Sequence, residues 1–420
     1  MPFQVSLSGI DASSTALDVV ANNIANSQTT GFKTSRVNFA DVYATGSLAL
    51  SSNAIGEGVA ISDVDQQFTQ GNITQTGNNL DLAMSGQGFF TLHDASGYTY
   101  TRNGTFSVDN QGFVVNATNQ KLQVYPALST GGFNTGALSD LQLNTSQSAP
   151  QATANAAVNV NLPADATAPT DTPFSPTDPA SYTETTSTAV YDSLGNQHTA
   201  TFFYIATGTP NQWNVAMTID GTLVNTTAAN PTGVQPLDFS ATGTITTPTN
   251  SIITFPDPAS GAAAYQPTTG ANPMTLTINM TGTTQYGNQF GVNTITQDGF
   301  STGQLTTISV DGTGVVSAKY TNGRSLELGQ LAISNFPDPQ GLAPLGNSNW
   351  GQTFASGGVI HGTAESANLG TIQSGALESS NVDLTKELVN MITAQRAFQA
   401  NAQMITTDDQ ITQTVLQIRG

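Results

Sequence analysis

The sequence predicts a mostly β protein with two β-domains, the outer one inserted in the inner one, and long terminal helices that pair as a coiled-coil-like stem. Near both ends of the chain, apolar side chains recur at alternating spacings of three and four residues, as they do along a helix that packs on another helix. Between the ends, Gly, Thr, Asn and Ser alternate with short β-branched runs, which is typical of strands and turns. Lys and Arg are absent between Lys121 and Lys319, and this sets the inserted segment apart.

The N-terminal helix is predicted within residues 1–30. The apolar positions that we expect to form a seam along it, the N-terminal seam, are Leu7, Ile10, Leu17 and Ile24. Asn22, Asn23 and Asn26 offer hydrogen bonds at the C-terminal end of this helix, and Gly31 suits the turn that follows it.

The partner helix is predicted over residues 375–420. Its apolar positions, the C-terminal seam, are Leu384, Leu388, Met391, Phe398 and Ile405, continued with a shift by Ile411 and Val415. Because isolated helices of such lengths are marginal in water, each seam needs a partner. We interpret the seams as contacts with other copies of the chain. The alternative is that each helix docks on its own domain as an ordinary core element.

The segments between the helices are assigned in nested order. We expect a connecting arm over 31–70 and 360–374, a discontinuous inner β-domain over 71–150 and 286–359, and an outer β-domain over 151–285. Strand signals include Gly88–Leu92 and Thr201–Ile205. The stretch from Ser107 to Val114 is echoed from Ser309 to Val316, and the Thr/Pro/Ala-rich composition of about residues 150–285, without positive charge, supports one β-domain interrupted by an insertion. Two unrelated hairpins would give the same echo.

Composition excludes several classes of function. Only 9% of residues are charged and the net charge is −19, so a nucleic-acid partner is not expected. The chain has no cysteine, which excludes thiolate chemistry. No run of about 18 apolar residues occurs, so we expect no membrane insertion. The first basic residue is Lys33, so we also expect no Sec signal.

Catalytic constellations are not found in the sequence. His93, His198 and His361 are isolated from one another, with no second His at helical spacing, which makes metal ligation improbable. Gly86-Gln87-Gly88 lacks a third glycine and runs into Phe89, so it favours a strand entry over a phosphate site. We therefore predict a protein that is not an enzyme, with no catalytic residue, no cofactor and no metal.

Both ends of the chain resemble the bacterial flagellar rod and hook family of axial proteins. Ala21–Ser27 with Gly31-Phe32-Lys33 resembles the N-terminal signature of that family, and Gly375–Leu384 with Glu387–Ile392 and Ala394–Phe398 resembles its C-terminal partner motif. Asn38–Tyr43 resembles the N-terminal arm of its hook subunits, and the long insertion resembles their outer domain. The residues that carry the motifs are Asn22, Asn23, Asn26, Gly31, Phe32, Asn381 and Val382.

The resemblance implies a structural subunit that leaves the cell uncleaved through the flagellar type III export apparatus. It implies a homopolymer that grows beneath a hook cap protein into the hook, a curved hollow tube between the distal rod and the hook–filament junction proteins. This tube acts as a universal joint that transmits torque from the rod to the filament. The implied location is the bacterial flagellum, at the basal body and hook, outside the cell after export.

Two other interpretations remain open at this stage. A distal-rod or other axial protein would share the terminal motifs, although rod proteins are shorter and lack so large an insertion. A secreted adhesin or carbohydrate-binding protein would use the insertion to expose Tyr191, Tyr204 and Trp213. The paired terminal motifs speak against this second interpretation.

Overall fold

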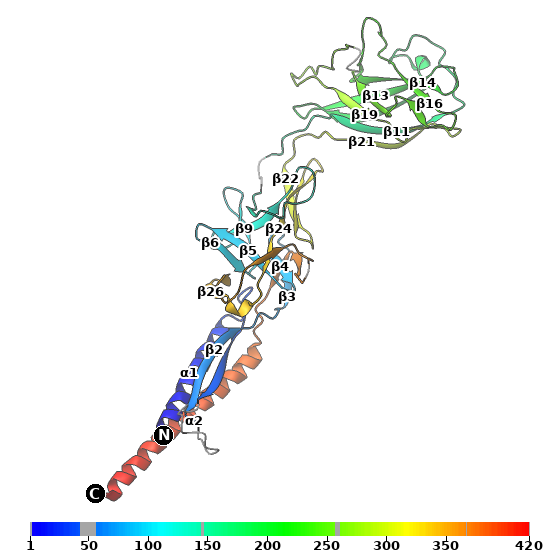
Figure 1. The fold of residues 1–420 in the computed structure, drawn as a ribbon. Helices are drawn as coiled ribbons and strands as arrows, with labels where there is room; N and C mark the ends of the chain where they lie inside the picture. The colour runs from blue at the N-terminus through cyan, green and yellow to red at the C-terminus, as the bar shows by residue number, and fades with distance from the viewer. Residues whose placement is uncertain (1, 43–55, 144–146, 257–260, 367, 420) are drawn as a thin grey trace. The chain divides into compact units, whose positions relative to one another are not determined.

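The computed structural model describes residues 2–42, 56–143, 147–256, 261–366 and 368–419, and its ribbon is drawn in Figure 1. The chain divides into two compact units. The main unit comprises residues 1–145, 306–319 and 325–420, and the inserted unit comprises residues 146–305 and 320–324. Strands supply most of the regular structure, and the two α-helices, α1 (Pro2–Ala25) and α2 (Leu384–Arg419), are terminal, as the sequence predicts.

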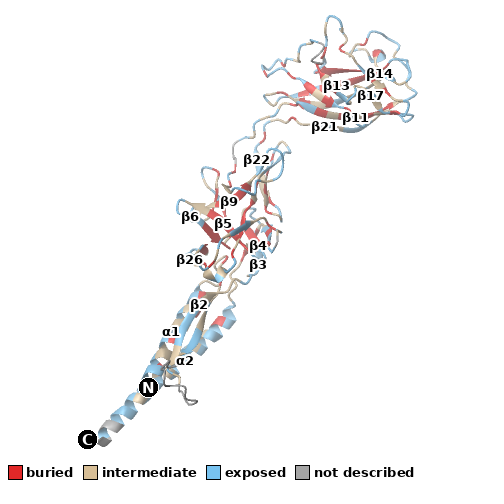
Figure 2. Cartoon of the chain, in the orientation of Figure 1, coloured by how far each residue is buried: buried red, intermediate tan, exposed pale blue. Residues whose placement is uncertain are grey.

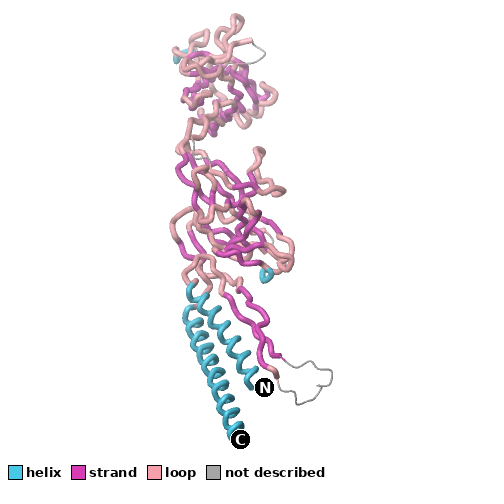
Figure 3. The backbone as a smooth tube through the Cα atoms, turned by 90° about the vertical axis from the view of Figure 1, so that its left-hand side faces the viewer, coloured by secondary structure: helices cyan, strands magenta, loops and turns pink. Residues whose placement is uncertain are grey.

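The two helices lie along each other, with a strand hairpin beside α1 (Figure 3). This hairpin pairs β1 (Ser35–Val42) with β2 (Gly58–Gln66) in antiparallel register. The expected arm over 31–70 is therefore built largely from a regular hairpin. Tyr43, the last residue of the arm motif, lies outside the described residues.

The C-terminal helix starts later than predicted. We expected helix from residue 375, but Ala376–Glu378 forms the strand β30, which pairs with β3 (Ile73–Gln75). Asp383 then caps α2, because its side chain accepts hydrogen bonds from the backbone N–H groups of Thr385 and Lys386. The strand pairing and the cap together place the helix start at Leu384.

The main unit is built around one large sheet, whose strands come from the chain before and after the insertion. The order along its longest path is β22-β23-β24-β9-β5-β6-β27-β26, so strands after the insertion hydrogen-bond to strands before it. The early strands of this set are β5 (Phe89–Asp94), β6 (Gly97–Thr101), β7 (Ser107–Val108), β8 (Val114–Val115), β9 (Lys121–Pro126) and β10 (Ser139–Asp140). Its late strands are β22 (Leu305–Val310), β23 (Val315–Tyr320), β24 (Ser325–Leu331), β25 (Ile333–Asn335), β26 (Ala343–Gly346), β27 (Asn349–Gly351) and β28 (Ile360–Gly362). A separate two-stranded sheet pairs β4 (Leu82–Ser85) with β29 (Thr371–Ser374).

The second half of the expected arm, residues 360–374, is not an arm. Strand β28 pairs with β25, and β29 pairs with β4, so this stretch belongs to the β part of the main unit. Its backbone hydrogen bonds are satisfied by residues far away in sequence, which a local pattern does not reveal. A core of side chains such as Phe90, Leu122 and Leu331 lies beneath these strands.

The inserted unit is a sandwich of two sheets. One sheet has the order β18-β19-β11-β20 with β21 on β11, and the other has the order β12-β13-β14-β16-β17 with β15 on β14. Side chains of both sheets, among them Val160, Ile278, Phe202 and Met217, share one core. The strands are β11 (Asn155–Pro163), β12 (Glu184–Tyr191), β13 (Gln197–Ala206), β14 (Gln212–Ile219), β15 (Thr222–Leu223), β16 (Gln235–Phe239), β17 (Ile245–Thr247), β18 (Ile252–Phe255), β19 (Leu276–Asn279), β20 (Thr284–Tyr286) and β21 (Gly291–Gln297).

Two expectations about the insertion need correction. Its unit extends past residue 285, because β21 pairs antiparallel with β11 and Asn322 donates a hydrogen bond to the carbonyl of Ser301. Tyr204 and Trp213 are buried in the sandwich core rather than exposed. Figure 2 shows buried segments on several strands of this unit. A carbohydrate-binding surface built on these two aromatic side chains is therefore ruled out.

Candidate functional site: the terminal stem and its junction

Helix α1 packs on α2 through a face of small side chains. Ser6, Gly9, Ser13, Ala16 and Val20 follow one another at spacings of three or four, and the buried members are Ser6, Ser13 and Val20. A Cβ atom on Gly9 would lie 2.6 Å from Nδ2 of Asn401, so the two helices approach closely there. The intramolecular helix contact thus uses a different face from the predicted N-terminal seam.

The predicted seams remain largely in contact with solvent in the single chain (Figure 2). Among them, Leu7, Leu384, Leu388, Phe398 and Ile411 are exposed, and Ile10, Leu17, Ile24, Met391 and Ile405 are half-buried. The side chain of Val415 lies outside the described residues. Because no described seam residue is fully buried, the interpretation of the seams as ordinary intramolecular core is disfavoured.

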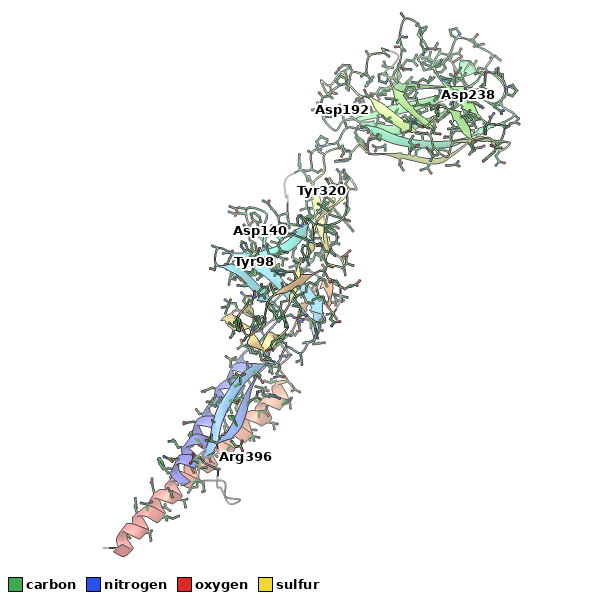
Figure 4. All side chains as sticks on the ribbon, viewed as in Figure 1. Tyr98, Asp140, Asp192, Asp238, Tyr320 and Arg396 are labelled. Atoms are coloured by element: carbon green, nitrogen blue, oxygen red, sulfur yellow. The ribbon has the colours of Figure 1, made fainter. Side chains whose placement is uncertain are left out.

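The exposed apolar surface of the stem is wider than the predicted seams. Phe3 and Val5 on α1, and Val389, Ile392 and Met404 on α2, are also exposed. Phe3 and Ile392 are four positions from Leu7 and Leu388 and widen the seams. Val5, Val389 and Met404 lie on other faces of their helices, because each residue turns the helix by about 100°. Figure 4 shows the side chains of α2 along the helix, with Arg396 labelled.

A groove of about 740 Å³ lies between α1, α2 and the hairpin β1–β2. Its apolar walls include Ala12, Ala16, Phe39, Val59 and Ala397. Phe39 and Ile61, which are cross-strand partners in the hairpin, are both exposed. Sequence reasoning missed this groove because it did not predict the hairpin.

Three asparagines of the N-terminal motif have separate structural roles. Asn23 is buried and binds both backbone groups of Ser35: its Oδ1 accepts from the N–H at 2.9 Å and its Nδ2 donates to the carbonyl at 2.8 Å. Asn26 donates to the carbonyl of Asn22 at 3.0 Å, which matches the predicted capping role. Asn23 therefore braces α1 against β1, a role that capping chemistry did not indicate.

Gly31 and the residues after it form the turn between the C-terminal end of α1 and the start of β1. Gly31 has a positive φ of 69°, and its N–H donates to the carbonyl of Glu378 at 2.8 Å. Phe32 is half-buried next to it. On the C-terminal side, Asn381 Oδ1 accepts from the N–H of Thr34 and its Nδ2 donates to the carbonyl of Gln67. Val382, also half-buried, continues the segment toward α2.

A buried ionic cluster completes this junction. Glu378 is fully buried; its Oε1 lies 2.6 Å from Lys33 Nζ and its Oε2 lies 3.3 Å from Arg102 Nη1. The ammonium of Lys33 also donates to the carbonyl of Thr69, and the N–H of Gly71 donates to Glu378 Oε1. Burial lowers the pKa of Lys33 and that of Arg102, and the carboxylate of Glu378 opposes both shifts. One carboxylate, at the end of β30, thus joins the segment between α1 and β1, the segment that leads into β3, and the residue that follows β6.

Sequence reasoning did not assign Lys33, Arg102 and Glu378 to the junction. Lys33 and Glu378 are 345 positions apart in the sequence, so no periodic pattern links them. Two signals were available: Lys33 and Glu378 lie within the two terminal motifs, and the chain has only nine Lys and Arg residues, two of which are in this cluster.

The histidines are isolated in the sequence, but two of them lie beside carboxylates in the fold. His93 Nδ1 is 3.7 Å from Asp140 Oδ1, and His198 is held more closely. In the inserted unit its Nδ1 lies 2.6 Å from Asp220 Oδ2 and its Nε2 lies 3.3 Å from the buried Asp192, which is labelled in Figure 4. Burial by itself lowers the pKa of His198, but the hydrogen bonds to Asp220 and Asp192 outweigh burial and raise it. In the described part of the chain, no group of three or more His, Asp or Glu side chains is arranged to hold a metal ion.

Four family models match the chain. Their descriptions are "Flagella basal body rod protein" over residues 3–33, "Flagellar hook protein FlgE/F/G D1 domain" over 83–170, "Flagellar basal body protein FlaE D2 domain" over 161–300, and "Flagellar basal body rod FlgEFG protein C-terminal" over 373–418. These matches agree with the fold, in which the two ends of the chain form a helical stem and one β unit is interrupted by a second one. The fold and the matches together define a flagellar axial protein of the rod and hook class. None of the four descriptions is that of an enzyme.

Proteins that are similar to this chain over its whole length identify its family within this class. The chain is 38% identical to "Flagellar hook protein FlgE" of Escherichia coli over the full length of both sequences. It is 37% identical to the protein of the same name from Salmonella typhimurium, also over both full lengths, and 33% identical to that of Treponema pallidum over 98% of each. The chain belongs to the flagellar hook protein FlgE family and is a subunit of the flagellar hook.

A solved structure supports the fold. The crystal structure of Helicobacter pylori flagellar hook protein FlgE2 matches with a TM-score of 0.53 at 14% identity, over 73% of this chain and all of that one. As a hook component, the protein is located in the bacterial flagellum. Among the described helices, none is long and apolar enough to cross a membrane.

Proposed function

We propose that this hook subunit polymerises through its two terminal seams into a curved hollow tube that serves as a universal joint between rod and filament. The observation that carries the proposal is the placement of the seams: α1 and α2 contact each other through small side chains and leave large apolar ones exposed. In a polymer, burial of these side chains against other copies would supply about 25 cal/mol for each Å² of apolar surface removed from water.

The remaining partners follow from the same role. A tube that grows outside the cell needs an export route, which we assign to the flagellar type III apparatus, and a hook cap protein at its growing end. The distal rod would bind its base, and the hook–filament junction proteins would bind its tip. The low charge of the chain, 9% of residues, fits interfaces that slide during bending, because small polar contacts resist sliding less than directional ion pairs.

The test is polymerisation of the purified full-length protein, followed by sedimentation and electron microscopy. Leu388→Ser removes a seam side chain that is 45% exposed, and Leu128→Ser is a matched control at 47% exposure outside the stem. Burial of the exposed half of a Leu is worth about 1 kcal/mol, so the critical concentration of Leu388→Ser should rise at least about fivefold. Leu128→Ser should form curved tubes at the wild-type concentration.

Two results would count against the proposal. Wild-type protein that forms no tubes at any concentration would contradict self-assembly as such. Equal critical concentrations for Leu388→Ser and wild type would contradict the seam assignment while leaving polymerisation intact.

A further inference from the structure

The inserted unit holds one histidine between two carboxylates. Residues 146–305 contain no Lys or Arg and only one His, His198. The side chain of His198 is 8% exposed, with Asp220 Oδ2 at 2.6 Å from its Nδ1 and Asp192 Oδ2 at 3.3 Å from its Nε2. Among the described residues, His198 is the one basic side chain that pairs with either carboxylate. Its proton is therefore the positive charge of this cluster.

The same two carboxylates also hold a segment between β18 and β19. The hydroxyl of Tyr265 donates to Asp220 Oδ2 at 3.3 Å, and Thr269 Oγ1 donates to Asp192 Oδ2 at 3.0 Å. The rings of Tyr265 and His198 meet edge to face, with centroids 5.9 Å apart. Residues 265–269, the tethered segment, thus share both carboxylate oxygens with His198.

The protonation state of His198 decides whether both contacts of its ring are favourable. A protonated imidazole donates from both nitrogens, whereas a neutral imidazole donates from one and carries a lone pair on the other. Loss of the proton therefore leaves one carboxylate oxygen facing a lone pair. It also leaves two neighbouring carboxylates without a cation, which is unfavourable in a site that water reaches poorly.

Burial decides which of the two carboxylates moves when the proton is lost. Asp192 is fully buried and accepts hydrogen bonds from the backbone N–H and the side-chain amide of Asn196, so it cannot turn toward water. The Asp220 side chain is 43% exposed, and its other oxygen accepts from one backbone N–H, that of Thr199. Asp220 can reach solvent at a smaller cost. The contact that breaks is then its bond with Tyr265.

We propose that His198 is a pH-sensitive switch within the inserted unit: its protonated form holds Tyr265 in place through Asp220, and loss of the proton frees the Tyr265 end of the tethered segment. The Thr269 end stays bound to Asp192. The switch works inside a single chain, so it does not depend on the proposed polymerisation.

The groups around the ring set the pH at which the switch acts. The titratable side chains that face His198 are Asp192 after β12, Asp220 after β14 and Tyr265. Their carboxylates outweigh burial and raise the pKa of His198, so release is expected above pH 6.5. Arg324, the other cation of this unit besides His198, lies over a Phe ring at 4.0 Å.

Spin labels can report the release, because the chain has no cysteine of its own. Thr268→Cys places a nitroxide at an exposed position of the tethered segment, and Ala241→Cys places one in the exposed loop between β16 and β17 as a control. Spectra of the full-length monomer are recorded from pH ~5 to pH ~9, on both sides of the ordinary pKa of His. The label at 268 should be immobile at low pH and mobile at high pH, with a midpoint above 6.5, while the label at 241 should not change.

Two variants assign the transition to the cluster. His198→Gln cannot take up a proton, so the mobility of the label at 268 should no longer depend on pH. Asp220→Asn keeps the histidine but removes one of its carboxylates, so the midpoint should move to lower pH. Asn tolerates the positive φ of 50° at this position, and the side chain is 43% exposed, so this variant should fold even if His198→Gln does not.

Three results would overturn the inference. The label at 268 could keep one mobility over the whole pH range, or its transition could persist unchanged in His198→Gln or in Asp220→Asn. An equal change at 241 and 268 would show that the whole unit loosens, rather than the Tyr265 end alone.

Discussion

Replacement of Glu378 by Gln is the sharpest test of the junction between the stem and the β part of the main unit. The substitution keeps the size and shape of the side chain but removes the negative charge that both Lys33 and Arg102 contact. The new amide nitrogen is a donor, and in either rotamer it must face one of these cationic donors. Two buried cations are then left without a carboxylate.

The magnitude follows from burial. Lys33 and Glu378 are almost completely excluded from solvent, and Arg102 is 4% exposed, so water cannot replace the lost partner. Removal of one member of a buried ion pair costs about 3–5 kcal/mol. The total stability of a typical domain is about 5–15 kcal/mol, so the main unit should lose about a fifth or more of its free energy of unfolding.

The assay exploits the two tryptophans of the chain, one in each unit. Trp350 is buried in the main unit, where its Nε1 donates to Gln66 Oε1 at 2.6 Å, and Trp213 is buried in the inserted unit. In a Trp213→Phe background, Trp350 fluorescence reports unfolding of the main unit alone. Urea titrations of monomer at low concentration then give the free energy of unfolding with and without Glu378→Gln.

A matched control is Glu327→Gln, which neutralises an exposed carboxylate in β24 of the same unit. We expect this change to alter stability by less than about 0.5 kcal/mol. A loss of under 1 kcal/mol for Glu378→Gln would refute the reasoning, since it would mean that the cluster contributes no more than a surface pair.

Two further predictions concern single positions. Because the pKa of His198 is raised above 6.5, its contribution to stability is complete below pH 6.5 and is lost as pH rises through the folded-state pKa. In a Trp350→Phe background, the inserted unit should therefore be less stable at pH ~9 than at pH ~6, and His198→Gln should flatten this difference; an unchanged slope would contradict it. Gly31→Ala places a methyl group 2.6 Å from the backbone N of Asn103 at a positive φ, so it should destabilise the main unit by at least about 1 kcal/mol in urea titrations; a neutral effect would contradict the turn.

Local pattern was enough to predict most of the secondary structure. The spacing of Leu7 and Ile10 or of Leu384 and Leu388 indicates a helix, because the period of 3.6 residues is a property of the helix itself. Strand β13 was predictable because its run Thr201–Ile205 is a short stretch of aromatic and β-branched residues, which favours a strand. The sequence also determined that the ends are helical, that the middle is β and that cysteine chemistry is absent.

Tertiary structure decided what these elements contact. Residues 376–378 form a strand because β3, some 300 positions earlier in the chain, offers its hydrogen-bonding edge. The helices meet through Gly9 and Ser13 because small side chains allow close approach, and that choice leaves the larger seam residues exposed. Lys33, Arg102 and His198 acquire their carboxylates only when distant segments come together. Periodicity in the sequence indicates which side of a helix or strand is apolar. The segment that packs against that side depends on contacts between residues that are distant in sequence.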